Sequence, residues 1–300
     1  MANISPTKSI VYKTVDKLQI SLDIYLPSNG AQKVPICLWY HGGGLLQGHR
    51  NQAPPWLRKA VNTHSIAFIS ADYRFAPQIG ITEALQDVAD SIHFCRESLT
   101  SHLLPEEKNA IDPSRLAVSG SSAGGYLALL AGLYINPKPQ VILPIYPITD
   151  PLGTFFTNPQ PPAMGRPLGS KEEIREFLDP HADVVANNEA DSKRMAMYLW
   201  MQHDANLAKL WKIDDSDPAR AKKWRLPRNV FECRLPPAYI MHGDADTGVG
   251  VEQADEMVGA MVGCGLEVVY ERPHGKEHFF DAGEVYENDR FWAFALKHLK

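Results

Sequence analysis

The chain has 300 residues, of which 44% are hydrophobic and 22% charged, as is typical of a folded globular protein. This length suits one domain of about 250 residues with an insertion, or two modest domains. The formal charge at pH 7 is −5, whereas a surface that binds nucleic acid or acidic lipid needs an excess of basic residues. The sequence contains no run of about 20 apolar residues, so no membrane span is predicted.

The N-terminal stretch and the cysteines predict a cytoplasmic protein. Residues 1–13 lack the basic start and the apolar run of a signal peptide. The cysteines lie far apart and form no CxxC pair, which favours reduced thiols over disulfides or a zinc site; they are Cys37, Cys95, Cys233 and Cys264. We expect a small-molecule substrate as partner, with no nucleic acid and no membrane, and the sequence leaves a homodimer open.

Short strand patterns alternate with helix patterns along most of the chain. Alternating apolar residues predict two opening strands, 9–13 and 18–26, joined by a tight turn. Such a pattern is typical of an α/β fold with a mostly parallel central sheet, helices on both faces and the opening hairpin at one edge. Further strands are predicted at 34–40, 65–71, 116–119, 141–146, 237–241 and 267–271, and helices at 82–98, 123–133 and 284–299.

The alternation stops over residues 151–235. This segment lacks strand patterns, has prolines near its ends and contains helical pieces such as 170–178, which opens with the spacing of a capping box. We therefore predict a helical cap, or lid, at 151–235, inserted into an α/β core formed by residues 1–150 and 236–300.

The first chemical motif lies directly between a predicted strand and a predicted helix. Residues 120–124 read Gly-Ser-Ser-Ala-Gly and match GxSxG, the pattern of a nucleophile elbow with Ser122 as nucleophile. Glycine has no Cβ, so the flanking glycines relieve the crowding of such a sharp turn. The following helix directs the positive end of its dipole at the site.

A second motif, His-Gly-Gly-Gly at 41–44, follows the predicted strand 34–40. Acyl transfer develops negative charge on a carbonyl oxygen, and backbone N–H groups without obstructing side chains can stabilise that charge. We expect the N–H groups of Gly42, Gly43 and Ala123 to form this oxyanion hole.

Taken with three further motifs, these two strings resemble the α/β-hydrolase superfamily, and within it the hormone-sensitive-lipase-like esterases. The further motifs are Asp-Tyr-Arg at 72–74, HGDAD at 242–246 and GKEHFF at 275–280. The resemblance covers residues 12–150 and 235–300, and implies a cofactor-free hydrolase of carboxylic esters. The late motif HGDADTGV also looks like the peptidase and feruloyl-esterase-like branches, so the subfamily stays open.

The resemblance further implies the order nucleophile, acid, histidine along the chain. The acid is then Asp246, which orients the imidazole and stabilises its charged form, and the base is His278. Asp244 and His274 remain the alternatives. The His-x₃-His spacing has no third ligand nearby, so we expect no metal. In the resemblance, Arg74 is a structural ion-pair partner and not a catalytic residue.

The expected reaction is hydrolysis of a small-to-medium carboxylic ester or lactone through an acyl-enzyme that water resolves. Three alternatives keep the same triad: an aryl formamidase, a peptidase-like amidase, and a biosynthetic enzyme that transfers or cyclises the acyl group. A ligand receptor is the alternative from another class, because the plant gibberellin receptor resembles this family but lacks a working triad histidine.

Methionines and aromatic residues are concentrated in residues 191–202 beyond the needs of one narrow buried stripe. Methionine adapts to irregular apolar shapes, and aromatic rings provide large contact areas. We therefore predict that Tyr198, Trp200 and Met201, together with Leu45 after the glycine motif, bind the acyl or alcohol part of the substrate.

Overall fold

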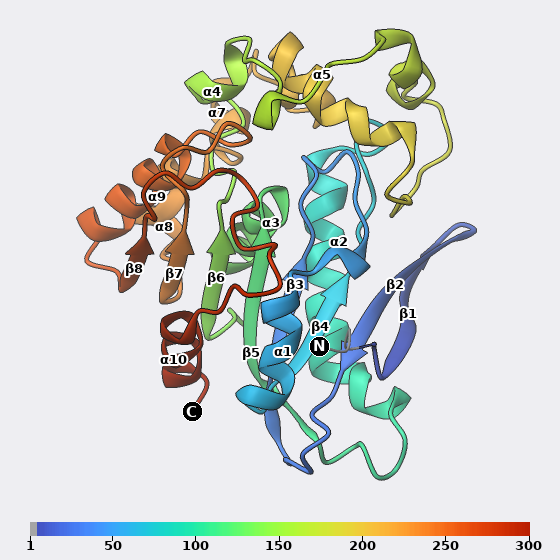
Figure 1. Cartoon of the computed structure of the whole chain (residues 1–300), viewed down its shortest axis with the longest axis vertical. Helices are drawn as coiled ribbons and strands as arrows, with labels where there is room; N and C mark the ends of the chain where they lie inside the picture. Colours follow the sequence, from blue (N-terminus) through green and yellow to red (C-terminus); the bar gives the residue numbers. More distant parts are fainter. Residues whose placement is uncertain (1–4) are drawn as a thin grey trace.

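The computed structural model describes residues 5–300 and contains a central eight-stranded sheet with helices on both faces (Figure 1). From β1 to β8, the strands span Lys8–Val15, Leu18–Tyr25, Val34–Tyr40, Ala67–Ala71, Ile111–Ser121, Val141–Ile145, Ala238–Met241 and Val268–Glu271. Their order across the sheet is β1-β2-β4-β3-β5-β6-β7-β8. β2 runs antiparallel to β1 and β4, and the other neighbours are parallel. The predicted mostly parallel α/β architecture is confirmed.

The helices that cover the sheet form two layers. On one face lie α1 (Pro55–Thr63) and α10 (Asp289–His298), and on the other α2 (Ile81–His93), α3 (Ala123–Tyr134) and α9 (Glu252–Gly263). Every residue of β3 is buried, and successive side chains point to opposite faces. Trp39 therefore packs with α1 and α10, whereas Leu38 packs with α2 and α3. A continuous apolar run suits a parallel strand that is covered on both faces.

Most of residues 151–235, which we call the cap segment, lies across the carboxyl ends of the parallel strands, at the top of Figure 1, and its last part, with α8, runs down beside α9 to the start of β7. The segment contains no strand, and the 3₁₀-helix Lys171–Leu178 lies where a helical piece was expected. Its short α-helices are α4 (Thr154–Thr157), α5 (Met197–Asp204), α6 (Leu207–Leu210), α7 (Pro218–Lys222) and α8 (Val230–Cys233). That this segment acts as a lid stays a prediction.

Hydrogen bonds hold the cap segment on the body of the molecule. The indole Nε1 of Trp211 donates to the Gly44 carbonyl at 2.7 Å, and Arg194 Nε donates to the Leu46 carbonyl at 2.6 Å. Both acceptors belong to the loop after β3. The cap segment therefore holds the loop that carries the glycine motif through these two hydrogen bonds.

Some element boundaries differ from those predicted. The helix expected at 82–98 is α-helical only to His93 and continues as a π-helix over Phe94–Ser98. The last helix begins at Asp289 rather than at 284, because Asn288 caps it and accepts a hydrogen bond from Phe291 N at 3.0 Å.

The part of the chain from residue 5 onwards has no helix with both the length and the apolar character to cross a bilayer. The first four residues of the stretch 1–13, on which the expectation of no signal peptide rests, lie outside the described residues.

Candidate active site

Ser122 occupies a strained turn between β5 and α3. Its φ of 58° and ψ of −118° lie in a region that side chains other than glycine rarely adopt, and its N–H donates to Ile145 O at 2.8 Å. A Cβ on Gly120 would lie 2.1 Å from the Gly124 carbonyl oxygen, and one on Gly124 would lie 2.0 Å from Tyr40 O. Only glycine fits at either position, so the tight turn is built into the sequence around Ser122.

Asp246 and His278 come together from the loops that follow β7 and β8. His278 Nδ1 lies 2.6 Å from Asp246 Oδ2, and both side chains are almost fully buried, with exposures of 3% and 0%. The other carboxylate oxygen of Asp246 accepts hydrogen bonds from the N–H groups of Gly248 at 2.8 Å and Val249 at 2.7 Å. Both oxygens are thus fixed, and one of them is aimed at the imidazole.

The surroundings of Asp246 keep its carboxylate ionised. Burial alone would raise the pKa of this carboxyl, but the charge of His278 and hydrogen bonds from His242 and His278 outweigh burial and hold the pKa well below its usual range. His242 contributes because its Nε2 lies 3.3 Å from Asp246 Oδ2. An ionised, oriented carboxylate is the partner that an imidazole needs when it accepts a proton.

A second Asp–His pair lies in the same two loops. His274 Nδ1 lies 2.9 Å from Asp244 Oδ2, but the His274 side chain is 97% exposed. His278 lines the cavity that also contains Ser122, and neither Asp244 nor His274 does. Geometry therefore favours Asp246 and His278 over their alternatives as partners of Ser122.

The glycine motif approaches Ser122 closely. A Cβ on Gly42 would lie 3.1 Å from Ser122 Cβ, and Gly43 has a φ of +102°. The N–H groups of Gly42 and Gly43 donate no hydrogen bond among residues 5–300. Ala123 is the first residue of α3, so its N–H has no partner within that helix. These three donors remain available for a developing negative charge.

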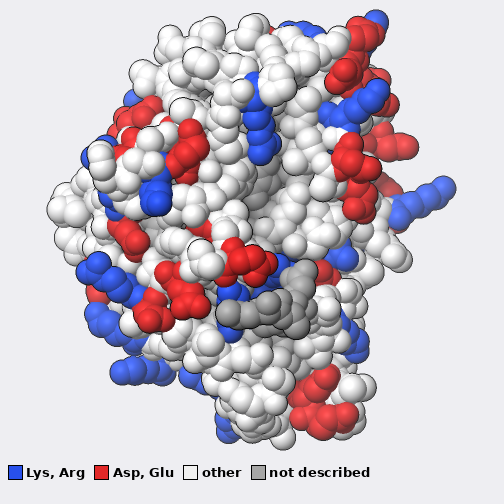
Figure 2. All heavy atoms as spheres, in the orientation of Figure 1, with Lys and Arg blue, Asp and Glu red and all other residues white. Residues whose placement is uncertain are grey.

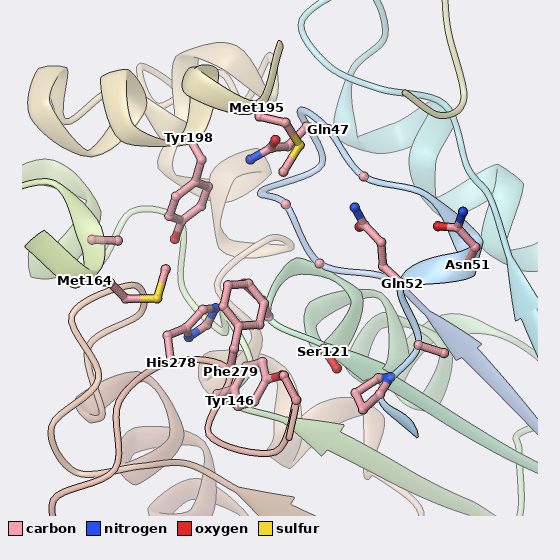
Figure 3. Close-up of a pocket in the computed structure, with 18 of the residues that line it drawn as sticks. Gln47, Asn51, Gln52, Ser121, Tyr146, Met164, Met195, Tyr198, His278 and Phe279 are labelled. Atoms are coloured by element: carbon pink, nitrogen blue, oxygen red, sulfur yellow. The ribbon is translucent and has the colours of Figure 1, made fainter. Parts of the chain in front are cut away.

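Ser122 and His278 line a cavity of about 420 Å³ beneath the cap segment (Figure 3). The ring centroid of the His278 imidazole lies 4.5 Å from that of Tyr146 and 4.4 Å from that of Phe279. Several lining residues were not predicted from the sequence, because they belong to no motif: Gln47, Asn51, Arg58, Met164 and Arg166. Phe279 in the GKEHFF motif, and Met195 and Leu199 in the segment 191–202, also line the cavity but were not named.

Of the four substrate-binding residues predicted from the sequence, Tyr198 lines the cavity, and its hydroxyl donates to Gly248 O at 2.6 Å. The structure does not bring the other three to the cavity. Leu45 and Met201 are each 1% exposed and pack in the main core. Trp200 lies against His203, with ring centroids 5.3 Å apart. These apolar side chains serve packing, a use that composition alone does not distinguish from substrate binding.

A family model described as the α/β-hydrolase fold matches residues 37–282, which is most of the chain and includes the elbow, the glycine motif and both Asp–His pairs. The chain belongs to the α/β-hydrolase family. Two solved structures share its fold. A thermophilic esterase of Thermogutta terrifontis, bound to propionate, has a TM-score of 0.65 and 19% identity, covering 99% of this chain and 95% of that one. An α/β-hydrolase superfamily protein of Enterococcus faecalis has a TM-score of 0.70 and 18% identity, covering 99% and 98%.

This α/β-hydrolase is also similar to segments of much longer curated proteins. The non-reducing polyketide synthase pkbA of Emericella nidulans is 26% identical over 328 residues, which cover 91% of this chain and 13% of that protein. The non-reducing polyketide synthase Preu6 of Preussia isomera is 30% identical over 177 residues, or 57% of this chain and 8% of that protein. The chain therefore spans about an eighth or less of the length of these relatives.

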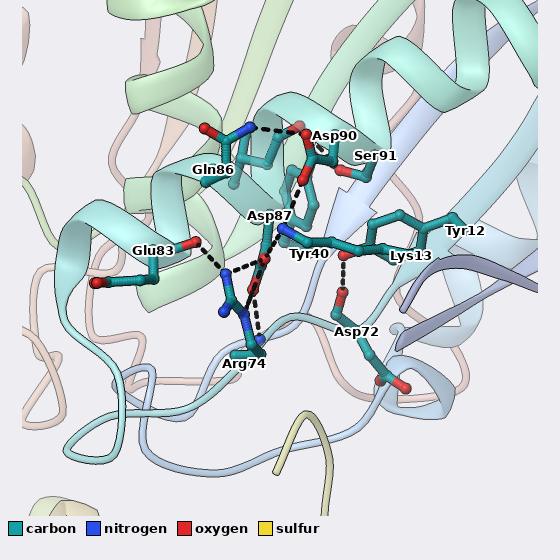
Figure 4. A network of polar contacts seen from close by, with 11 residues as sticks. Tyr12, Lys13, Tyr40, Asp72, Arg74, Glu83, Gln86, Asp87, Asp90 and Ser91 are labelled. Carbon is teal, nitrogen blue, oxygen red and sulfur yellow. Dashed lines mark hydrogen bonds and ion pairs between the residues drawn. The ribbon is translucent and has the colours of Figure 1, made fainter. Parts of the chain in front are cut away.

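Buried ion pairs join α2 to β1 and to the segment after β4 in the α/β-hydrolase body (Figure 4). Arg74 Nε and Nη2 both donate to Asp87, at 2.9 and 2.8 Å, and Lys13 Nζ lies 2.6 Å from the same carboxylate. The geometry of Arg74 is thus that of a structural ion-pair partner. Among residues 5–300, no group of three or more His, Cys, Asp and Glu side chains is arranged to hold a metal ion.

Proposed function

We propose that this α/β-hydrolase is a serine carboxylesterase that cleaves a carboxylic ester or lactone of small-to-medium size. One observation carries the proposal: His278, which shares a 2.6 Å hydrogen bond with the buried Asp246, lines the same cavity as a serine held in a strained elbow. Structural ion pairs also bring Asp and His together, but they do not place an imidazole and a strained serine on the wall of one cavity.

In the proposed mechanism, Ser122 Oγ attacks the ester carbonyl carbon and its proton passes to Nε2 of His278. The N–H groups of Gly42, Gly43 and Ala123 stabilise the oxyanion of the tetrahedral intermediate. His278 then gives the proton to the departing alkoxide, which leaves as the alcohol. Water attacks the acyl-enzyme by the same route, releasing the acid and restoring the serine.

Ser122 Oγ and His278 share no hydrogen bond among residues 5–300, although both line the cavity. Such contacts are often long in the free enzyme and tighten when substrate binds. We therefore expect this hydrogen bond to form when the substrate binds.

Replacing Ser122 by alanine tests the proposal directly. We expect Ser122→Ala to lower kcat by about 10⁴- to 10⁶-fold and to abolish labelling by a fluorophosphonate probe, because the nucleophile is lost. Ser121 also lines the cavity, so Ser121→Ala is the matched control and should keep the label. A label that maps to Ser121, or a Ser122→Ala protein that keeps most of its turnover, would show that the nucleophile is another residue.

A second candidate keeps the acyl-enzyme and changes its fate. Similarity to segments of non-reducing polyketide synthases favours a biosynthetic α/β-hydrolase that passes the acyl group to an alcohol or cyclises it. Product analysis with and without an alcohol acceptor separates hydrolysis from acyl transfer or cyclisation, because hydrolysis converts the acyl group only into the free acid.

The amidase and aryl formamidase alternatives differ in the bond cleaved, and a panel of formamides beside esters distinguishes them. A non-catalytic receptor is disfavoured by the position of His278.

We extend the proposal to a cytoplasmic location, a small-molecule substrate and no nucleic-acid or membrane partner, and leave a homodimer open as in the sequence analysis. On the face seen in Figure 2, Lys and Arg side chains are interspersed with Asp and Glu instead of forming one basic area, which agrees with the negative formal charge.

A further inference from the structure

Gln47 is a polar side chain of the cavity wall that the proposed mechanism does not use. It is 7% exposed, and its Oε1 is buried without a hydrogen-bond partner among the described residues. Leaving a buried amide oxygen unpaired costs stability. Since Gln47 lines the cavity, a rotation of its carboxamide that brings Oε1 to the cavity surface lets a bound ligand supply the missing partner (Figure 3).

Gln47 also lies next to the proposed oxyanion hole. A Cβ on Gly43 would meet the Gln47 carbonyl oxygen at 2.2 Å and Gln47 Cγ at 2.9 Å. The first part of the Gln47 side chain therefore packs against Gly43, whose N–H is one of the proposed oxyanion donors. A ligand group bound by its carboxamide must be close to the carbonyl under attack.

The rest of the cavity limits the chemistry of that group. Arg58 and Arg166 line the cavity, and no Asp or Glu does, so an ammonium group would be repelled. A carboxamide offers an oxygen that accepts and an NH₂ that donates, and a hydroxyl can pair with either. Met164, Met195 and Phe279 supply apolar walls for the remainder of the ligand.

We infer that the cavity takes an ester with an apolar or aromatic body and a hydroxyl group near the reacting carbonyl, and that Gln47 binds this hydroxyl. The inference rests on the proposed ester hydrolysis and names the substrate class of that site. Sites that hydrogen-bond a substrate hydroxyl discriminate strongly against the analogue that lacks it, because their own polar group is then left unpaired.

Matched aryl esters test the inference. The panel is phenyl benzoate, phenyl 3-hydroxybenzoate, 3-hydroxyphenyl benzoate and the two corresponding methoxy esters. We expect kcat/KM for at least one hydroxy ester to exceed that for phenyl benzoate about tenfold or more. Gln47→Leu should reduce this ratio at least tenfold, whereas Gln86→Leu, the same change on the exposed face of α2, should leave it as in the unmodified protein. Gln47→Met serves if the leucine variant does not fold.

Three kinetic results would overturn the inference: no preference for either hydroxy ester, an equal loss on all esters in Gln47→Leu, or the same preference for methoxy as for hydroxy esters. Calorimetric binding of the esters to the Ser122→Ala protein separates failure of the inference from failure of the proposed function. If nothing is hydrolysed and no fluorophosphonate label appears, the proposed hydrolysis fails. At least tenfold tighter binding of a hydroxy ester than of phenyl benzoate then supports the hydroxyl site, and equal or absent binding overturns it.

Discussion

Two Asp–His pairs lie in one pair of loops, and their surroundings decide what each can do. The carboxylate of Asp246 is fully buried and that of Asp244 is 25% exposed. Water and salt screen the exposed pair, so it contributes little to stability or orientation. The buried pair is screened much less, and its His278 lines the cavity. This contrast provides a control for catalysis within the same motif.

Substitutions in the two pairs should therefore differ by orders of magnitude. We expect Asp246→Asn to lower kcat about 10⁴-fold, because an amide no longer holds the imidazole in the required tautomer. His278→Ala should cost at least as much. Asp244→Asn and His274→Ala should change kcat only a few-fold. Steady-state kinetics on one ester, with circular dichroism to verify folding, measures all four variants, and a reversed order would transfer the catalytic role to the exposed pair.

At the residue scale, the candidate triad was predictable because a motif ties each of its members to a strand end. Ser122, Asp246 and His278 each follow a strand directly or by a short loop, and parallel strands bring such loops to one edge of the sheet. Gln47 and Met195 carry no such signal. Their place in the cavity depends on contacts between segments far apart in the chain, which no local pattern contains.

At the scale of elements, the end of β3 shows how one buried residue shapes a loop. His41 is fully buried and stacks on Tyr73 with ring centroids 4.4 Å apart, and its Nδ1 lies 2.8 Å from Gly42 O. A Cβ on Gly48 would lie 2.3 Å from the same Nδ1, so the loop folds back onto the imidazole. The ring thus supports the glycine motif from beneath.

The buried imidazole of His41 predicts a pH dependence of stability. Burial lowers its pKa to about 4, whereas the unfolded chain takes up this proton near pH 6.5. Between these values the unfolded state binds more protons, so the free energy of unfolding falls as the pH drops from about 6.5 to 4. Urea denaturation should show a loss about 3 kcal/mol larger in the unmodified protein than in His41→Asn. Parallel pH curves for the two proteins would mean that His41 is protonated in the folded state.

Helices were predictable where their apolar pattern is long and unbroken, and not elsewhere. β3 and α3 appear close to the ranges expected for them, whereas α1 and α9 were not predicted. Both α3 and α9 contain glycines, each of which disfavours a helix by about 1 kcal/mol relative to alanine, but α3 is apolar almost throughout, whereas polar residues interrupt the apolar pattern of α9. α1 has only nine residues, too few for a helix that is stable alone. Packing on the sheet stabilises both.

At the scale of the whole molecule, the cavity lies where the cap segment meets the carboxyl ends of the strands. The core supplies Ser122, His278, Gly42 and Gly43 among other residues, and the cap segment supplies Ala163, Met164, Arg166, Met195, Tyr198 and Leu199. The fold class followed from the alternation of strands and helices. The shape of the cavity did not, because it depends on how the short helices of the cap segment dock on the core.

Two adjacent residues of α5 separate substrate selection from packing. Leu199 lines the cavity. Trp200 does not line it, and packs between His203 and Lys171, whose Nζ lies 5.2 Å from its ring centroid. Its Nε1 is buried without a hydrogen-bond partner among residues 5–300. One side chain thus lines the cavity, and the next joins parts of the cap segment.

Alanine substitutions at these two positions should therefore affect different properties, substrate preference at Leu199 and thermal stability at Trp200. Leu199→Ala enlarges the cavity, so kcat/KM for p-nitrophenyl octanoate relative to the acetate should change about tenfold or more, since each methylene in an apolar pocket contributes roughly 10- to 200-fold discrimination. Trp200→Ala should lower the melting temperature by a few degrees, because packing is lost, and leave the ranking of acetate, butyrate and octanoate as it is. Calorimetry and the ester panel measure both effects on the same samples. If Trp200→Ala reorders the esters while Leu199→Ala does not, the substrate must enter on the side of α5 that faces Lys171, and the cavity above Ser122 would not be the acyl site.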